Sequence, residues 1–301
     1  MQQVTTNAYR QDILWRYIIT GCGLLLIILT LAIGAFLCYK GVGTFTTYNH
    51  SIGEFLFSAD WAPSDTSEGG GAVGAAIFIF GSVVTCALAL TIATPFSLAT
   101  AIFMTEISPE LGKRFVQPAV EIFVGIPSVV YGWIGLTILV PLIKDIFNLR
   151  VGFSVLAASI VLAVMIFPTI TSLAADALRS IPKSYRAASY GLGATRWQTI
   201  AEVVVPAAVT GLMTAIILGL ARAFGEALAV AMVIGKMRAF PTSILSPTNN
   251  LTAAIAADMG GAMEGSEYNI ALWTMALLLF FISLACIFAI HYLGAKGGKQ
   301  A

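Results

Sequence analysis

The stretch DALRSIPKSYRAASYGLGATRWQTIAEVVVP, residues 176–206, is a polar segment between two long apolar segments. Pro182 suits the start of a short helix, because its ring fixes φ and it has no N–H to leave unpaired. Three residues of that helix share one face: Tyr185, Ala188 and Ser189. Gly191 and Gly193 then permit a tight turn before a second helix begins. The segment therefore predicts a helix, a glycine turn and a helix that together connect two spans.

Apolar segments make up most of the remaining chain. Hydrophobic residues form 58% of the sequence and charged residues 10%, whereas soluble domains carry roughly 25% charged residues. A bilayer core takes about 20 apolar residues per helix, and lipid cannot satisfy the open edge of a sheet. We therefore predict an all-α integral membrane protein with about six transmembrane helices, at residues 13–38, 73–104, 115–142, 152–175, 203–235 and 270–293.

The basic residues favour one orientation in the membrane. With both termini in the cytoplasm, ten Lys and Arg residues fall inside, five fall outside, and Arg222 lies within a span. The positive-inside rule therefore predicts this orientation for a multi-pass membrane protein. Two loops, 39–72 and 236–269, then face outward, and their Gly, Ser, Pro and Asn content predicts irregular structure exposed to solvent.

Sequence motifs for ATP binding, for hydrolytic catalysis and for metal binding are absent. The sequence contains no GxxxxGK[ST] loop for the phosphates of ATP, no HExxH motif and no GxSxG motif. The cysteines show no metal-binding spacing: Cys22, Cys38, Cys86 and Cys286. The net charge of +1 provides no field for nucleic acid. We therefore expect no catalytic residue, no metal site, no bound cofactor and no nucleic-acid partner, and any transport must draw its energy from another subunit.

Residues 176–206 resemble the cytoplasmic coupling loop of ABC importer permeases, which reads Glu-Ala-Ala, three residues, Gly, nine residues, then Ile-x-Leu-Pro. Ala187 stands at the Glu position, and the later positions follow in register: Ala188, Ser189, Gly193, Val203, Val205 and Pro206. The resemblance implies a coupling helix that inserts into a groove of an ATP-binding subunit. The residues that it implies for this contact are Ser184, Tyr185, Arg186, Ala187, Ala188, Ser189, Gly191, Gly193 and Pro206.

The leading Glu of the pattern is absent at Ala187. We expect Arg186 or Lys183 to supply a different polar contact with the ATP-binding subunit. The alternative is that the segment is a plain connection between two spans.

Two further segments resemble the PstC type of permease from phosphate-specific ABC transporters: GIPSVVYGWIGLTILVP at 125–141 and GLARAFGEALAV at 219–230. The resemblance covers roughly residues 70–293. It implies the type I ABC importer permease (MetI-like) fold and a non-catalytic, channel-forming subunit for inorganic phosphate. The implied division is an N-terminal segment, first span and outer loop at 1–72, a permease core at 73–293 and a cytoplasmic tail at 294–301.

The same resemblance implies the partners of this chain. They are a homologous PstA-like permease, two PstB-like subunits that bind ATP and Mg, an external PstS-like phosphate-binding protein, and membrane lipid.

Arg222 and Glu226 stand four residues apart in the fifth predicted span, so a continuous helix would place them on one face. A charge within a span costs about 2.5 to 3.5 kcal/mol and usually faces a bundle interior or a water-filled path. The planar guanidinium fork matches phosphate oxygens. We therefore expect Arg222 to meet the anion and Glu226 to hold Arg222 in place between transport events.

Four alternatives to this interpretation remain open. The pair could be purely structural, or the solute could be another oxyanion or an unrelated molecule. The chain could also be a secondary transporter driven by an ion gradient, or a sensor or scaffold without transport.

Overall fold

The computed structural model of the chain describes residues 2–297, with side chains described for residue 11 and residues 13–292. Within this part, five helices are long and apolar enough to cross a membrane: Ile13–Thr46, Ala76–Ile107, Ser128–Ile146, Val155–Ser180 and Glu267–Tyr292. A sixth crossing is a bent pair, Arg196–Ala207 and Val209–Gly225, whose axes differ by 68°. The prediction of an all-helical membrane fold with about six spans is confirmed. Residues 298–301 of the predicted tail lie outside the described residues.

The first part of the chain forms one long helix and then small outer elements. These are α1 (Gln2–Gly41), α2 (Gly43–Thr46), α3 (Ile52–Phe57), and the antiparallel pair β1 (Trp61–Ala62) and β2 (Ala72–Val73). The next helices, with π-helical turns written η, are α4 (Ala76–Ile102), η1 (Phe103–Ile107), α5 (Pro109–Leu111), η2 (Gly112–Val116), α6 (Gln117–Gly125), α7 (Ser128–Ile134), η3 (Gly135–Leu139) and α8 (Val140–Ile146).

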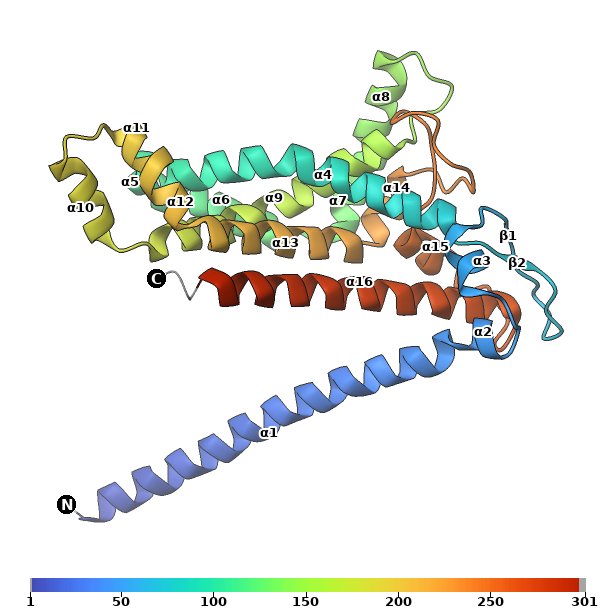
Figure 1. Cartoon of the computed structure of the whole chain (residues 1–301), viewed down its shortest axis with the longest axis horizontal. Coiled ribbons are helices and arrows are strands. Elements are labelled where there is room, and N and C mark those ends of the chain that lie inside the picture. Colours follow the sequence, from blue (N-terminus) through green and yellow to red (C-terminus); the bar gives the residue numbers. More distant parts are fainter. Residues whose placement is uncertain (1, 298–301) are drawn as a thin grey trace.

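The second half begins with a long central helix and ends with another. Its elements are α9 (Val155–Ser180), α10 (Lys183–Gly191), α11 (Arg196–Gln198), η4 (Thr199–Val204), α12 (Val205–Ala207), α13 (Val209–Gly225), α14 (Leu228–Val233), α15 (Leu251–Asp258) and α16 (Glu267–Gly297). Figure 1 shows α4, α9 and α13 side by side with α16 beneath them, while α1 diverges from this bundle toward the N-terminus.

Two segments that were predicted as single helices, 115–142 and 203–235, are interrupted in the structure. The first is interrupted at Ile126, which is extended at φ −71° and ψ 127°, because a residue that precedes proline disfavours the helical region. The second bends near Ala208, after Pro206 has removed a backbone donor. It then ends at Gly225, since Glu226 is extended at φ −77° and ψ 119°.

The outer loops are more structured than their composition predicts. Loop 39–72 contains two short helices and one strand of a hairpin, and loop 236–269 contains α15. Glu267, expected on the solvent-exposed surface, is 1% exposed. It accepts hydrogen bonds from His50 Nε2 at 2.7 Å and from the amides of Ser64 and Gly71 at 2.7 and 2.9 Å. These three donors take the place of the predicted hydration, because each carboxylate oxygen of Glu267 accepts at least one hydrogen bond.

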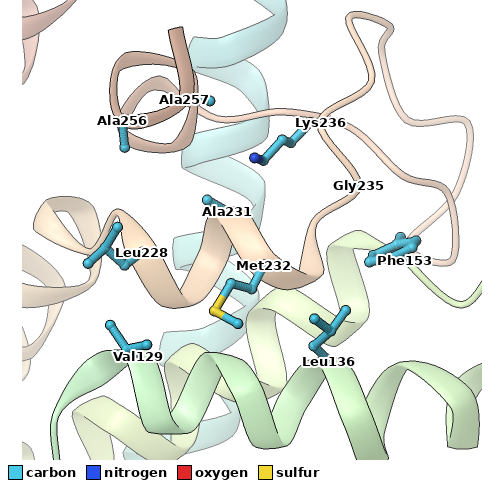
Figure 2. A pocket seen from close by; sticks show the side chains of 10 residues that line it. All are labelled: Val129, Leu136, Phe153, Leu228, Ala231, Met232, Gly235, Lys236, Ala256 and Ala257. Carbon is cyan, nitrogen blue, oxygen red and sulfur yellow. The ribbon is translucent and has the colours of Figure 1, made fainter. Parts of the chain in front are cut away.

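A cavity of about 500 Å³ lies between α7, α14 and α15. Figure 2 shows α7 and α14 running parallel beneath it, with Val129 opposite Leu228 at one end. The cavity is lined by Val129, Leu136, Phe153, Leu228, Ala231, Met232, Gly235, Lys236, Ala256 and Ala257. Its lining is apolar except for Lys236.

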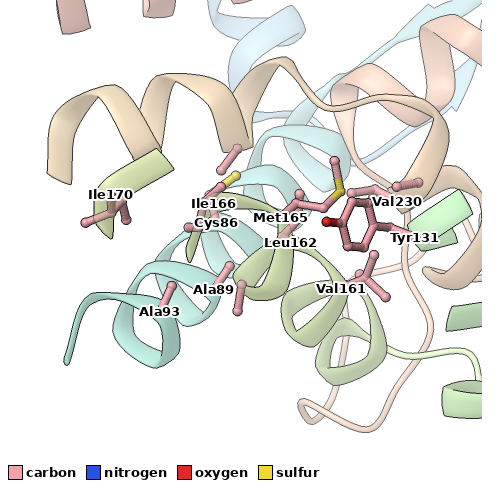
Figure 3. Packing of buried hydrophobic residues seen from close by; sticks show 14 of the residues in the cluster. Cys86, Ala89, Ala93, Tyr131, Val161, Leu162, Met165, Ile166, Ile170 and Val230 are labelled. Carbon is pink, nitrogen blue, oxygen red and sulfur yellow. The ribbon is translucent and has the colours of Figure 1, made fainter. Parts of the chain in front are cut away.

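The core lies where α4, α9, α7 and α14 meet (Figure 3). Small residues let the backbones approach, since helices in lipid associate through close packing rather than through water exclusion. A Cβ on Gly219 of α13 would stand 2.5 Å from Ile170 of α9, and one on Gly132 of α7 would stand 2.8 Å from the Cα of Ala229. The two interrupted helices are therefore held tightly against α9 and against each other.

Candidate anion path and coupling surface

The two helix breaks lie side by side in the fold. One separates α6 from α7 at residues 126–127, and the other separates α13 from α14 at residues 226–227. Because α7 and α14 run parallel in contact through Gly132 and Ala229, their first residues lie at the same end. Tyr131 bridges the first break by donating to the carbonyl of Phe123 at 2.8 Å. Broken helices at membrane depth require surrounding protein or a water-filled path for their free backbone groups.

Arg222 is half-buried in the last turn of α13, directly before the second break. Its Nη1 donates to the hydroxyl of Thr169, which follows Pro168 within α9. Two helices, α13 and α9, are therefore joined at this guanidinium.

The expected pairing of Arg222 with Glu226 is wrong in this structure. Among the side chains described, no ion pair joins the two residues. Glu226 instead accepts from the amide of Ala229 at 3.1 Å and thereby caps the start of α14. Its carbonyl accepts from the Thr252 hydroxyl at 2.8 Å. The physical reason is the helix break, because the rule that places residues four apart on one face holds only in a continuous helix.

Arg222 is consequently a cation without a carboxylate partner. A hydrogen bond to a charged group contributes about 1.5 to 3 kcal/mol, while an Arg in a span costs about 2.5 to 3.5 kcal/mol. The bond to Thr169 uses one of the five N–H donors of the guanidinium. The remaining donors and the uncompensated charge suit an anionic ligand.

The segment around α10 has the predicted helix–turn–helix form. Pro182 precedes the helix, Gly193 takes a left-handed φ of 84°, and Thr195 begins α11 with a capping box to Gln198. A groove of about 530 Å³ is lined by Ser184, Tyr185, Ala188, Ser189, Leu192, Ala194 and Val203.

Most of the predicted coupling residues are accessible on this surface. Those that are exposed are Ser184, Tyr185, Ala187, Ala188, Gly191, Gly193 and Pro206. Ser189 is buried and bonds the Thr199 hydroxyl at 2.9 Å. Leu192 is 90% exposed beside them. The surface offers apolar side chains and a shallow groove to a partner.

Arg186 differs from this group because its guanidinium faces inward. It donates from Nε and Nη2 to the two carboxylate oxygens of Glu106, at 3.0 and 2.5 Å. It also donates to the carbonyls of Ile181 and Leu178, at 2.8 and 3.0 Å. The hydrogen bond to Glu106 is the largest of the effects that raise the pKa of Arg186. In this structure the guanidinium of Arg186 is bound to Glu106, and a docking contact through Arg186 or Lys183 stays a prediction.

Glu106 is the residue of this region that the sequence did not single out. Its side chain is 8% exposed, and the carbonyls of Glu106 and Ile107 both accept from Arg196 Nη2. Arg186 and Arg196 thus join η1, which continues from α4, to both sides of the glycine turn. The sequence feature that could have identified Glu106 is an acidic residue at the end of an apolar segment, in a chain whose 176–206 loop is rich in Arg.

The comparisons with known proteins agree with this architecture. The family described as binding-protein-dependent transport system inner membrane component matches residues 93–296. The chain belongs to this family. A probable ABC transporter permease protein of Bacillus subtilis, YqgH, is 49% identical over 96% of this chain and 93% of its own length. The phosphate transport system permease protein PstC of Haemophilus influenzae is 35% identical over 80% of this chain and 81% of its own length.

Solved structures show the same fold for this inner membrane component. The chain resembles one from the MetNI methionine ABC transporter, captured facing inward, with a TM-score of 0.55, 21% identity, and coverage of 73% of this chain and 96% of the other. It also resembles a chain of a bacterial ABC transporter for import of the polysaccharide alginate, with a TM-score of 0.55, 16% identity and 99% coverage of both chains. The MetI-like permease fold is confirmed.

Membership in the family makes the chain an ABC importer permease, a membrane-spanning and non-catalytic subunit. It implies in general terms a partner permease, an ATPase and a binding protein. Among the described residues no cluster of His, Cys, Asp and Glu has metal-binding geometry.

Proposed function

We propose that this chain is a channel-forming permease subunit of an ATP-driven importer of inorganic phosphate. The observation that carries the proposal is Arg222, a half-buried cation inside the helix bundle whose hydrogen-bond partner is a neutral hydroxyl. Guanidinium binds tetrahedral oxyanions in a bidentate manner. The likeness to PstC permeases supports phosphate as the particular oxyanion.

The partners follow from the same proposal. A homologous permease would complete the path, two ATP-binding subunits would dock on α10 and its groove, and an external phosphate-binding protein would dock at the outer loops. In this scheme ATP and Mg belong to the ATP-binding subunits. Both termini and the loops 105–114 and 176–202 would lie in the cytoplasm.

In mechanism, closure of the two ATP-binding subunits would displace α10. The tight packing of α13 on α9 through Gly219 and Ile170 would transmit the displacement to the turn that carries Arg222. The path would then open outward, and phosphate from the binding protein would pass Arg222.

The test is uptake of radiolabelled phosphate by the assembled complex in a strain without other phosphate transporters. We expect ATP-dependent uptake by the parent complex and its loss in Arg222→Gln, because the amide lacks both charge and fork. Arg222→Lys should restore part of the rate, since ammonium lacks bidentate geometry. Glu226→Gln should be milder than Arg222→Gln, because Glu226 caps α14 and does not pair with Arg222.

Assembly of each variant is checked by co-purification of the ATP-binding subunits. Uptake of molybdate or sulfate but not phosphate by the parent would contradict the proposed substrate. Parental phosphate uptake by an assembled Arg222→Gln complex would contradict the role of Arg222.

A further inference from the structure

We propose that Lys236 and the cavity between α7, α14 and α15 form a second anion site, which an oxyanion occupies before it reaches Arg222. This inference rests on the proposed function, since it names the next residue along the same path. Its ligand class is a tetrahedral oxyanion such as inorganic phosphate. Neither Arg222 nor Glu226 lines this cavity.

The backbone around Lys236 is built to direct its side chain. Gly235 and Lys236 have consecutive positive φ values of 97° and 53°. A left-handed lysine is uncommon and persists only where its surroundings hold it. Thr248 provides that hold, because its amide donates to Ile234 at 3.2 Å and its carbonyl accepts from Met237 at 3.2 Å.

The turn is also fixed from its other side. A Cβ on Gly235 would lie 2.7 Å from Pro247 and 3.0 Å from Phe153, so only glycine fits there. A turn closed by Thr248, Pro247 and Phe153 aims Lys236 at the mouth of the cavity. Figure 2 shows its nitrogen directed toward the space between Ala231 and Ala257.

The electrostatic setting favours an anion. Of the ion pairs formed by the described side chains, none includes Lys236. Its neighbour Arg238 differs, since it donates to Asp258 at 3.3 Å and to Tyr268 at 3.1 Å. Lys236 is exposed at the edge of the cavity, and none of the other residues that line the cavity carries a charge, so an anion there meets one ammonium and no carboxylate of the lining.

One short element, α14, lies between Lys236 and the helix break that follows Arg222 in the chain. Lys236 follows the end of α14, and the break beside Arg222 precedes its start. The six residues of α14 span about 9 Å at 1.5 Å per residue. Lys236 therefore follows one end of α14, and the break that separates α14 from the helix of Arg222 lies at its other end.

The experiment removes the charge of Lys236 by substitution and then restores a positive charge by chemical modification. In the assembled transporter, Cys22, Cys38, Cys86 and Cys286 are replaced by alanine and Lys236→Cys is introduced. Uptake of phosphate should fall about tenfold or more, the loss that accompanies one charge-assisted hydrogen bond. Aminoethyl methanethiosulfonate restores an ammonium at nearly the length of lysine and should recover most of the rate. Methyl methanethiosulfonate, which is neutral, should not.

Lys144→Cys in the same background is the matched control. Lys144 is an exposed cation of α8 that does not line the cavity, so its loss should leave uptake unchanged. Parental uptake by Lys236→Cys, or equal recovery with both reagents, would overturn the proposal.

A second readout needs no transport. Inorganic phosphate should slow labelling of the Lys236→Cys thiol, relative to chloride at the same ionic strength, and should leave labelling at Lys144→Cys unchanged. If the cysteine-free parent shows no phosphate uptake, the proposed function fails, while slowed labelling still supports an anion site. If neither phosphate nor sulfate slows labelling, the second site is absent whatever the parent transports.

Discussion

At the scale of single residues, two threonines of α9 differ in a way that tests the setting of Arg222. The Thr169 hydroxyl accepts from Arg222, whereas the Thr171 hydroxyl is buried without a hydrogen-bond partner. Both side chains can be replaced by valine with almost the same shape. The structure therefore offers a matched pair of substitutions on one helix.

We expect Thr169→Val to reduce phosphate uptake about tenfold, because Arg222 loses the hydrogen bond that orients it, a bond of about 1.5 to 3 kcal/mol. Thr171→Val should leave uptake unchanged and should maintain or raise the thermal stability of the complex, since an unsatisfied hydroxyl is removed. The measurements are initial uptake rates and melting temperatures in detergent. Equal effects of the two substitutions on uptake would show that the Thr169 bond does not position Arg222.

The residue scale also marks the limit of spacing arguments. A separation of four residues predicted that Arg222 and Glu226 would be neighbours, but Gly225 and the extended Glu226 end the helix between them. The importance of both positions could be proposed from charge in an apolar segment. Their separate roles depend on the helix break after Gly225, which the hydropathy of the segment does not predict.

At the scale of elements, the Glu106–Arg186 pair joins η1, which continues from α4, to α10. It connects residues 80 positions apart in the sequence, and Arg196 adds a second connection to η1. Movement of α10 must therefore displace η1 and α4 or break a buried ion pair.

We expect Glu106→Gln to lower the melting temperature and to reduce the phosphate imported per ATP hydrolysed. Removing one member of a buried pair costs about 3 to 5 kcal/mol, because the other charge stays buried. Glu110→Gln is the control, since Glu110 is an exposed acid of α5 in the same segment. The ratio of uptake to ATP hydrolysis in proteoliposomes measures the coupling. An unchanged ratio in a folded Glu106→Gln complex would show that α4 does not receive the motion.

The outer hairpin depends on a second ion pair. His50 contacts Glu54 through Nδ1 at 3.1 Å and Glu267 through Nε2 at 2.7 Å. Because carboxylates face both ring nitrogens, the ring must be protonated to donate to both. Burial lowers the pKa of His50, but the hydrogen bonds to Glu267 and Glu54 outweigh it, and the pKa is raised.

This shift predicts the pH dependence of the outer loop. A raised pKa stabilises the folded loop fully below the unfolded value of about 6.5, and the stabilisation is lost as pH rises through the folded pKa. Amide exchange in residues 60–73, corrected for its intrinsic pH dependence, should therefore be slow below about pH 6.5 and should accelerate as pH rises through the raised pKa of His50. His50→Gln should remove this pH dependence, and a persistent slope in that variant would point to another titrating group.

At the scale of the whole molecule, the two functional regions lie at opposite ends of the bundle. Figure 1 shows α10 and α11 at one end and α8, α15 and the hairpin at the other. α1 is mostly exposed along its apolar length and contacts α16 near Gly34 and Gly41. Its exposed surface suits lipid or a neighbouring subunit.

The orientation of the bundle is a prediction from the ten-to-five distribution of Lys and Arg. We expect a cysteine at exposed Ser184 to react with an impermeant reagent only from the cytoplasmic side, and one at exposed Asp60 only from outside. The test uses a background without the four native cysteines and compares intact cells with inverted vesicles. Labelling of Ser184→Cys in intact cells would show that the orientation is the opposite of the predicted one.

The sequence alone determined the membrane fold, most span positions, the helix–turn–helix segment and the family resemblance. Hydropathy, proline and glycine act within a few residues, so these features can be predicted from a linear sequence. The division at residues 72 and 293 stays a prediction.

Only the tertiary structure decided which charges meet. The contacts of Arg222 with Thr169, Arg186 with Glu106, and His50 with Glu267 join residues 53, 80 and 217 positions apart. Such pairs depend on where helices break and how closely small residues let them pack, and neither local propensity nor hydropathy records this. The direction of Lys236 belongs to the same group, because a left-handed turn held by Thr248 sets it.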